Sequence, residues 1–235
     1  RCRCSSVQRC CALASRAMID LAIIDRGGPY PGTVDLIDIE WVDQRLGMAG
    51  LLRTVVRPES GCTWFLSAVC QREREPVVVL DYDLPLVTHT FEFRGSGIWA
   101  DIACEEEAER WTVGLEAFGL AVDPGEVVTP DSFGDRIAMG LDLDVETSSA
   151  LETEGDGLVH EVAVTGEVLV GSKAFEIDAV GVRRRRWDDY LPALTPPTPG
   201  IEVVGRLAVR WPGLPSAEIR GWVLGNRPGW VGLSA

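Results

Sequence analysis

A period of two in the apolar residues constrains this chain more than any other feature of its sequence. Within residues 141–146, leucine and valine alternate with aspartate and glutamate. A longer alternation spans residues 158–170 and 174–182, two segments that Gly171-Ser172-Lys173 connects. Successive side chains of a β-strand point to opposite faces, so this alternation predicts strands with one buried and one solvated face. The short connection predicts that the two longer segments form a hairpin.

Similar strand signals recur along the chain, and no window shows a helical period beyond a turn or two. The expected strands are Val34–Val42, Gly50–Val56, Thr63–Cys70, Val77–Tyr82, Thr90–Phe93, Gly97–Cys104, Trp111–Val122, Ile137–Thr147, Leu158–Val170, Ala174–Val182, Ile201–Trp211 and Ala217–Leu224. Many closely spaced strands without crossover helices predict an all-β fold, either a sandwich or a barrel. The long hairpins favour an antiparallel barrel.

The domain organisation is expected to have three parts. Residues 1–17 hold four cysteines and four arginines but no acidic residue, and we interpret them as a leader outside the fold. Residues 18–195 are expected to form the β-barrel domain. Residues 196–235 begin with a proline-rich linker and continue as a partial second β domain, because a complete one needs roughly 100 residues. Alternatively, these last strands complete the first barrel.

The charge of the chain limits its partners. The formal net charge is −14, from 36 acidic and 22 basic residues. Such a field repels phosphate backbones and anionic membrane surfaces, so no nucleic acid partner is predicted. No apolar stretch approaches the roughly 18 residues of a membrane span. Arg16 and Asp20 interrupt any secretion signal, which predicts a cytoplasmic location. The sequence does not predict the oligomeric state.

Residues typical of metal or nucleophilic catalysis are few. His89 precedes an expected strand and His160 lies on one, each without a metal-type partner at ligand spacing, and no Gly-x-Ser-x-Gly motif is present. The leader cysteines do not follow the Cys-x2-Cys spacing of a zinc site. The acidic residues of 141–146 are interpreted as the solvated face of a strand rather than a calcium site. We therefore predict no metal and no cofactor.

The most distinctive motif is a run of four arginines, Arg183–Arg186, followed by Trp187, Asp188, Asp189 and Tyr190. In a structural interpretation, the arginines pair with the abundant carboxylates at a strand end. In a functional interpretation, they form an anion-binding patch at a barrel mouth, where Trp187 and Tyr190 offer stacking surfaces.

This run and its context resemble a known family. The segments that carry the resemblance are 97–101, 104–105, 110–118, 166–171 and 175–190. Together they resemble the hydroxyneurosporene synthase (carotenoid 1,2-hydratase) and AttH-like group, over roughly residues 34–190 in family order. The resemblance implies a double lipocalin-type fold of two tandem barrels. For this chain we therefore expect one lipocalin-type barrel and an incomplete second one.

The resemblance also exposes a departure at the family motif Gly-x-Arg-Asp-His-Ser-Trp-Gly. Gly181, Arg183 and Trp187 align with it, whereas Arg184 stands in place of the aspartate and Arg185 in place of the histidine. Arginine does not deprotonate in proteins, so Arg185 cannot serve as a general base. The proton-handling group that the family implies for hydration is missing from this position.

These observations predict binding of a hydrophobic small molecule, such as an isoprenoid, a lipid or a polyketide-like compound, in an apolar barrel. The residues expected to contact it are Arg183, Arg185, Trp187, Tyr190, Trp99 and Trp111. The alternative is a diverged hydratase, cyclase or isomerase that acts on a hydrophobic olefin. In that case the arginines stabilise an anionic intermediate, and Asp188 or Asp189 exchanges the proton. A third possibility is an inactive, truncated family member.

Overall fold

The computed structural model describes residues 28–29, 32, 34–71, 74–122, 132–149 and 157–187. It also describes the backbone of residues 127–128 and 152–154 and of four short strands between residues 201 and 226. The expected leader, residues 1–17, lies outside these ranges.

The described chain consists almost entirely of antiparallel strands, with one short 3-10 helix at Pro58–Ser60, so the predicted all-β class is confirmed. The longer strands are β1 (Asp35–Asp43), β2 (Met48–Arg57), β3 (Cys62–Gln71), β4 (Val77–Pro85), β5 (Phe91–Gly95), β6 (Ile98–Glu106), β7 (Arg110–Ala121), β9 (Arg136–Thr147), β11 (Gly157–Val170) and β12 (Lys173–Trp187). The shorter strands are β8 (Val127–Val128), β10 (Glu152–Glu154), β13 (Ile201–Val204), β14 (Leu207–Val209), β15 (Ala217–Ile219) and β16 (Val223–Asn226).

One strand runs further than its sequence pattern predicts. The expected strand 174–182 ends where apolar alternation gives way to charge, but β12 continues through the arginine run to Trp187. The extension is stable because β12 lies between two long partners, β1 and β11, which supply ladder hydrogen bonds along its whole length. A central strand position therefore keeps the arginine run extended, although its side chains are charged.

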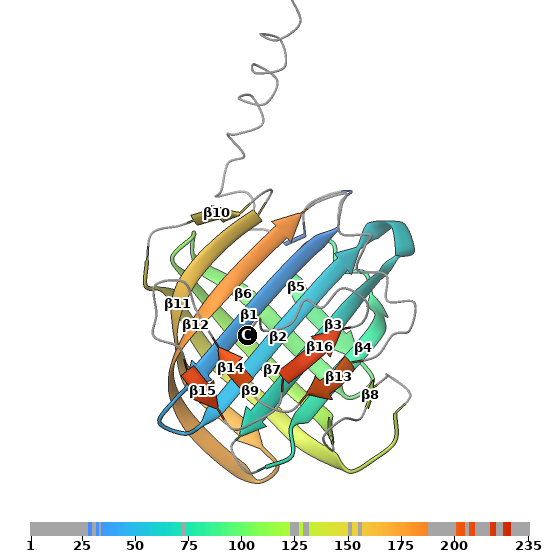
Figure 1. Ribbon diagram of the computed structural model, residues 1–235. Coiled ribbons are helices and arrows are strands. Elements are labelled where there is room, and N and C mark those ends of the chain that lie inside the picture. Colours follow the sequence, from blue (N-terminus) through green and yellow to red (C-terminus); the bar gives the residue numbers. More distant parts are fainter. Residues whose placement is uncertain are drawn as a thin grey trace, which may run out of the picture.

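An eleven-stranded sheet curls so that its ends partly meet as a ring (Figure 1). The order around the ring is β12, β1, β2, β3, β4, β7, β9 and β11, after which β11 pairs again with β12. The seam between β4 and β7 is short, because only Val77 and Val78 pair with Ala121 and Leu120. Beyond that point the hairpin β5–β6 occupies the same edge of β7. Separate small sheets contain β16, β13 and β8, and β14 and β15.

Alternate residues of the ring strands point inward and form one continuous apolar core. Its largest buried side chains include Trp41, Phe65, Phe93 and Trp111. Gly50 shows how closely this core is packed. It lies directly opposite Trp41 in the β1–β2 ladder, and a Cβ built on it would lie 2.2 Å from the indole ring. The indole therefore occupies the space that a side chain at residue 50 would need.

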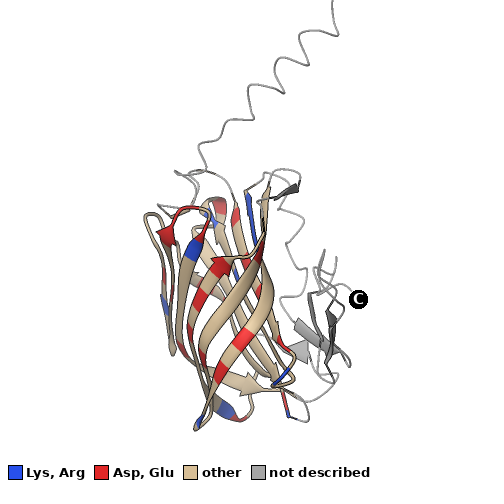
Figure 2. Cartoon of the chain, turned by 90° about the vertical axis from the view of Figure 1, so that its left-hand side faces the viewer, with Lys and Arg blue, Asp and Glu red and all other residues tan. Residues whose placement is uncertain are grey.

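The two outer sides of the ring differ in chemistry. On β5, β6, β7, β9, β11 and the first part of β12, outward positions carry many carboxylates, which recur along the strands in Figure 2. Asp142, Asp144 and Glu146 are all exposed there, so the predicted solvated face of residues 141–146 is confirmed. On β1–β4 the outward side chains are mostly buried. None of the described segments forms a helix with the length and apolar character that crossing a membrane would require.

Candidate functional site

The arginine run divides between the two faces of β12. Arg183 and Arg185 have the same parity as the buried Ile177 and Ala179, so their side chains point into the ring. Arg184 and Arg186 point outward. The two inward guanidinium groups lie at the end of the ring where β1 begins and β12 ends, which is uppermost in Figure 1 and is called the upper end below.

Arg185 and Asp35 form an ion pair inside this upper end, and both side chains have no exposed surface. Arg185 donates from Nε and Nη2 to the two carboxylate oxygens, at 3.2 and 2.8 Å. Its Nη2 also donates to the carbonyl oxygen of Gly28 at 2.8 Å, and its Cζ atom lies 5.0 Å from the ring centre of Phe91. This two-point geometry holds the guanidinium group in one orientation.

Arg183 lies against an aromatic pair. Its Cζ atom is 4.0 Å from the ring centre of Trp111, and that ring lies 5.1 Å from the ring of His160 at 61°. His160 is directly opposite Arg183 in the β11–β12 ladder, which explains how the three side chains meet. A desolvated cation on an indole face contributes about 2 kcal/mol. The indole Nε1 of Trp111 is buried and makes no hydrogen bond to any described residue.

Few carboxylates of the described residues are buried on the inner face of the ring. Of the carboxylates in the described residues, those buried on the inner face are Asp35 and Asp43. Asp43 lies at the opposite end of the ring, where it accepts hydrogen bonds from the backbone N–H groups of Leu46 and Asp178. Buried charge is costly unless it is balanced, and at the upper end Asp35 balances the guanidinium group of Arg185.

The structure brings together part of the predicted ligand-contact set. Arg183, Arg185 and Trp111 meet at the upper end, and Trp187 stands half-buried at the end of β12, opposite Asp35. Trp99 is elsewhere: it lies on the outer face, 36% exposed, with its Nε1 3.4 Å from Oε1 of Glu92. The remaining predicted residues, Asp188, Asp189 and Tyr190, lie outside the described residues.

Three residues of this site, Asp35, Phe91 and His160, were not among the predicted contacts. A signal for His160 is present in the sequence, because it shares its parity with the buried Val162 and Val164 on β11. A histidine in phase with valines belongs to the inner face of the strand. Asp35 and Phe91 share their parity with the buried Ile37 and Phe93, so alternation also predicts their inward direction. It does not predict their proximity to Arg185, which comes from the way the strands associate.

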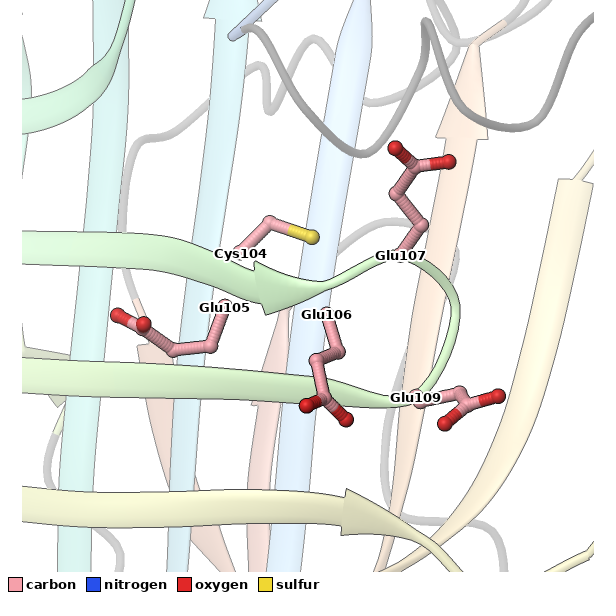
Figure 3. A pocket seen from close by; sticks show the side chains of 5 residues that line it. All are labelled: Cys104, Glu105, Glu106, Glu107 and Glu109. Carbon is pink, nitrogen blue, oxygen red and sulfur yellow. The ribbon is translucent and has the colours of Figure 1, made fainter.

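A second group of polar residues surrounds the turn between β6 and β7. Shallow cavities of about 430 and 510 Å3 lie here, the first lined by Cys104 and by glutamates at 105, 106, 107 and 109. Figure 3 shows these carboxylates pointing in different directions instead of converging on one point. Within the described residues, no three metal-binding side chains gather closely enough to hold an ion. The turn is an acidic surface without the geometry of a metal centre.

Comparison with known proteins finds no matching family model, no matching curated protein and no matching solved structure.

Proposed function

We propose that the protein binds a small hydrophobic molecule that carries an acidic oxygen group, and that it does so at the upper end of a lipocalin-type ring. The observation that supports the proposal is the buried stack of Arg183 on Trp111, beside the Arg185–Asp35 pair. A ligand carboxylate would accept hydrogen bonds from a guanidinium group here and from the indole Nε1–H of Trp111, which makes no hydrogen bond to any described residue.

The chemistry of the surrounding groups fits such a ligand. Hydrogen bonds between guanidinium groups and carboxylates are among the strongest in proteins, and burial strengthens them further. The Nε1–H of Trp111 is a buried donor that a ligand oxygen would satisfy. Phe91, which packs near Arg185 and near Phe93, offers an aromatic surface for the apolar part of the ligand.

The proposal concerns the upper end because the rest of the interior is occupied by core side chains. This restricts the ligand to a molecule that places its acidic group among the inward arginines and its apolar part against the neighbouring aromatic rings. Under this proposal the chain would be a diverged relative of the hydroxyneurosporene synthase-like group. It would keep the barrel and use arginine where the family motif has histidine.

Calorimetric titration with medium-chain fatty acids and the matched primary alcohols tests this function. We expect the acid to bind at least tenfold more tightly than the alcohol of equal length. Arg183→Met should remove that preference, and Trp111→Phe, which keeps the aromatic face but removes the N–H, should weaken acid binding several-fold. Arg184→Met is the matched control, because Arg184 points outward and pairs with Glu40. Equal binding of acid and alcohol, or no binding of either, would contradict the proposal.

A second candidate function is the diverged hydratase, cyclase or isomerase. The observation that favours it is the position of His160, which faces Arg183 from the adjacent strand and places an imidazole beside the segment where the family motif has its histidine. In this proposal His160 exchanges the proton, with Asp188 or Asp189 as its partner, and the inward arginines stabilise negative charge. Product formation from a hydrophobic olefin should be lost in His160→Gln and retained in Arg184→Met. Wild-type protein without turnover would exclude it.

A further inference from the structure

The outer face of β1–β4 is a second apolar surface. Outward residues of an antiparallel sheet commonly meet water. Here nine outward apolar side chains on or next to this wall are exposed by only 0 to 8%: Leu36, Val42, Leu51, Val55, Leu66, Ala68, Val78, Leu120 and Val122. Six of them pack as a cluster of their own, separate from the ring interior. A surface this apolar requires a cover that keeps water away.

Charged side chains on the same face also have little exposure to solvent. Arg53 donates from Nη2 to Asp38 at 2.9 Å, and the two side chains are 8% and 4% exposed. Next to them, Arg184 donates to Glu40 at 2.9 Å, and the side chain of Glu40 is 5% exposed. Burial raises the pKa of Glu40, although Arg184 acts in the opposite direction. Ion pairs on the outside of a bare sheet would be hydrated, so these pairs independently indicate a cover.

The chain itself supplies a segment in the right place. Strand β12 ends at Trp187 beside β1, at one edge of this face, and residues 188–235 follow it. Their strand β13 pairs with β8 through Ile201 and Val128. Strand β8 comes shortly after Val122, which belongs to the outer cluster at the other edge of the face. The segment thus starts at one edge of the face, and its strand β13 pairs with a strand that follows the other edge in the chain.

Length and charge agree with this placement. From β12 to β4 the face is four strand spacings wide, about 19 Å. The chain from Trp187 to Ile201 reaches about 45 Å when extended, which is enough to cross it. Residues 188–235 contain four acidic and four basic residues, in contrast to the net charge of −14 for the whole chain, and they include Trp211, Trp222 and Trp230. A neutral segment rich in apolar residues matches a face whose own charges cancel in pairs.

We propose that residues 188–235 cover the outer face of β1–β4 and belong to the same structural unit as the ring, in place of a partial second domain. The reactivity of the Cys70 thiol would show whether the face is covered. It points outward on β3 and is 5% exposed, whereas Cys104 is half-buried on β6, on the other side of the ring. The cover would make Cys70 slow to react with thiol reagents, and its removal would expose Cys70 without affecting Cys104.

The test uses the full chain with a protease site placed within residues 196–200 and with serine in place of the four leader cysteines. Before cleavage we expect a monomer in which Cys70 is alkylated at least a hundredfold more slowly than a denatured cysteine. After cleavage and release of the C-terminal fragment, Cys70 should react at least tenfold faster, with Cys104 unchanged. Rapid alkylation of Cys70 in the intact monomer would overturn the proposal, and so would protection that disappears on dilution, since a second copy would then be the cover.

A second measurement requires no cleavage, so it tests the proposal even if release of the fragment unfolds the ring. In the full chain, single cysteines placed in turn at residues 201–209 should include at least one that forms a disulfide with Cys70 under mild oxidation. The same scan against Cys104 is the control and should give none. The absence of any disulfide to Cys70 across the scan would overturn the proposal.

Discussion

The ion pair between Asp35 and Arg185 makes the sharpest prediction about stability. Asp35→Asn removes the negative charge but keeps the shape of the side chain. Arg185 would then remain as a cation with no exposed surface, in place of two charge-assisted hydrogen bonds at 3.2 and 2.8 Å. Removal of one partner of a buried pair typically costs about 3–5 kcal/mol. With a urea m-value of about 2 kcal/mol per molar, the midpoint of unfolding should fall by about 1.5–2.5 M.

A double-mutant cycle measures the coupling free energy between Asp35 and Arg185, apart from the effect of each substitution alone. Because Asp35→Asn/Arg185→Met removes both charges of the pair together, it should be more stable than the sum of the two single variants predicts, by about 2 kcal/mol or more. Urea unfolding followed by tryptophan fluorescence gives all four free energies. The matched control is Asp142→Asn, an exposed carboxylate on β9 that should change stability by less than about 0.5 kcal/mol. Additive single effects, or a cost below about 1 kcal/mol for Asp35→Asn, would refute the reasoning.

Two further predictions concern packing and pH. Gly50→Ala should cost about 2 kcal/mol or more, because the added Cβ would lie 2.2 Å from the Trp41 ring. Gly97→Ala, with nothing within 4 Å but a φ of +77°, should cost only about 1 kcal/mol in thermal unfolding, and the reverse order would contradict the packing argument. Burial raises the pKa of Glu40 above its ordinary 4.5, so the folded state binds the proton more tightly than the unfolded state. Relative to Glu40→Gln, wild-type protein should therefore lose stability as pH rises from about 4.5 through the raised value, by up to about 1.4 kcal/mol per pH unit; parallel stability curves would contradict this.

The alternation of residue types predicts much of the fold. Period two identifies the long strands and assigns side chains to faces, as the outward Asp142 and the inward Val162 show. Period two also predicts that Arg183 and Arg185 point inward, because side chains alternate between the two faces along a strand whatever their chemistry. The expected strand end at Val182 conceals this, since a charged run resembles the solvated end of a strand when its neighbours are unknown.

The association of the strands is what alternation does not predict. Asp35 meets Arg185, and Trp111 meets both Arg183 and His160, because ring closure aligns strands that are distant in the chain. Parity also does not reveal that β1 is buried on both faces, because its outward Asp38 and Glu40 resemble ordinary solvated residues. The pattern of a single strand carries no information on whether another segment covers it.

The pairing of β1 with β12 has a consequence for the newly made chain. Asp35 and Arg185 are separated by 150 residues. At a translation rate of 5–20 residues per second, β1 therefore waits about 8–30 s for the strand that completes its pairing. During that interval its free edge can pair with the edge of another nascent chain on the same polysome. The charges of Asp38 and Glu40 oppose such pairing, because charged edge strands repel one another. Arg53 follows Asp38 by only 15 residues, whereas Glu40 meets Arg184 only when β12 arrives, so the charge of Glu40 protects this edge for the whole interval.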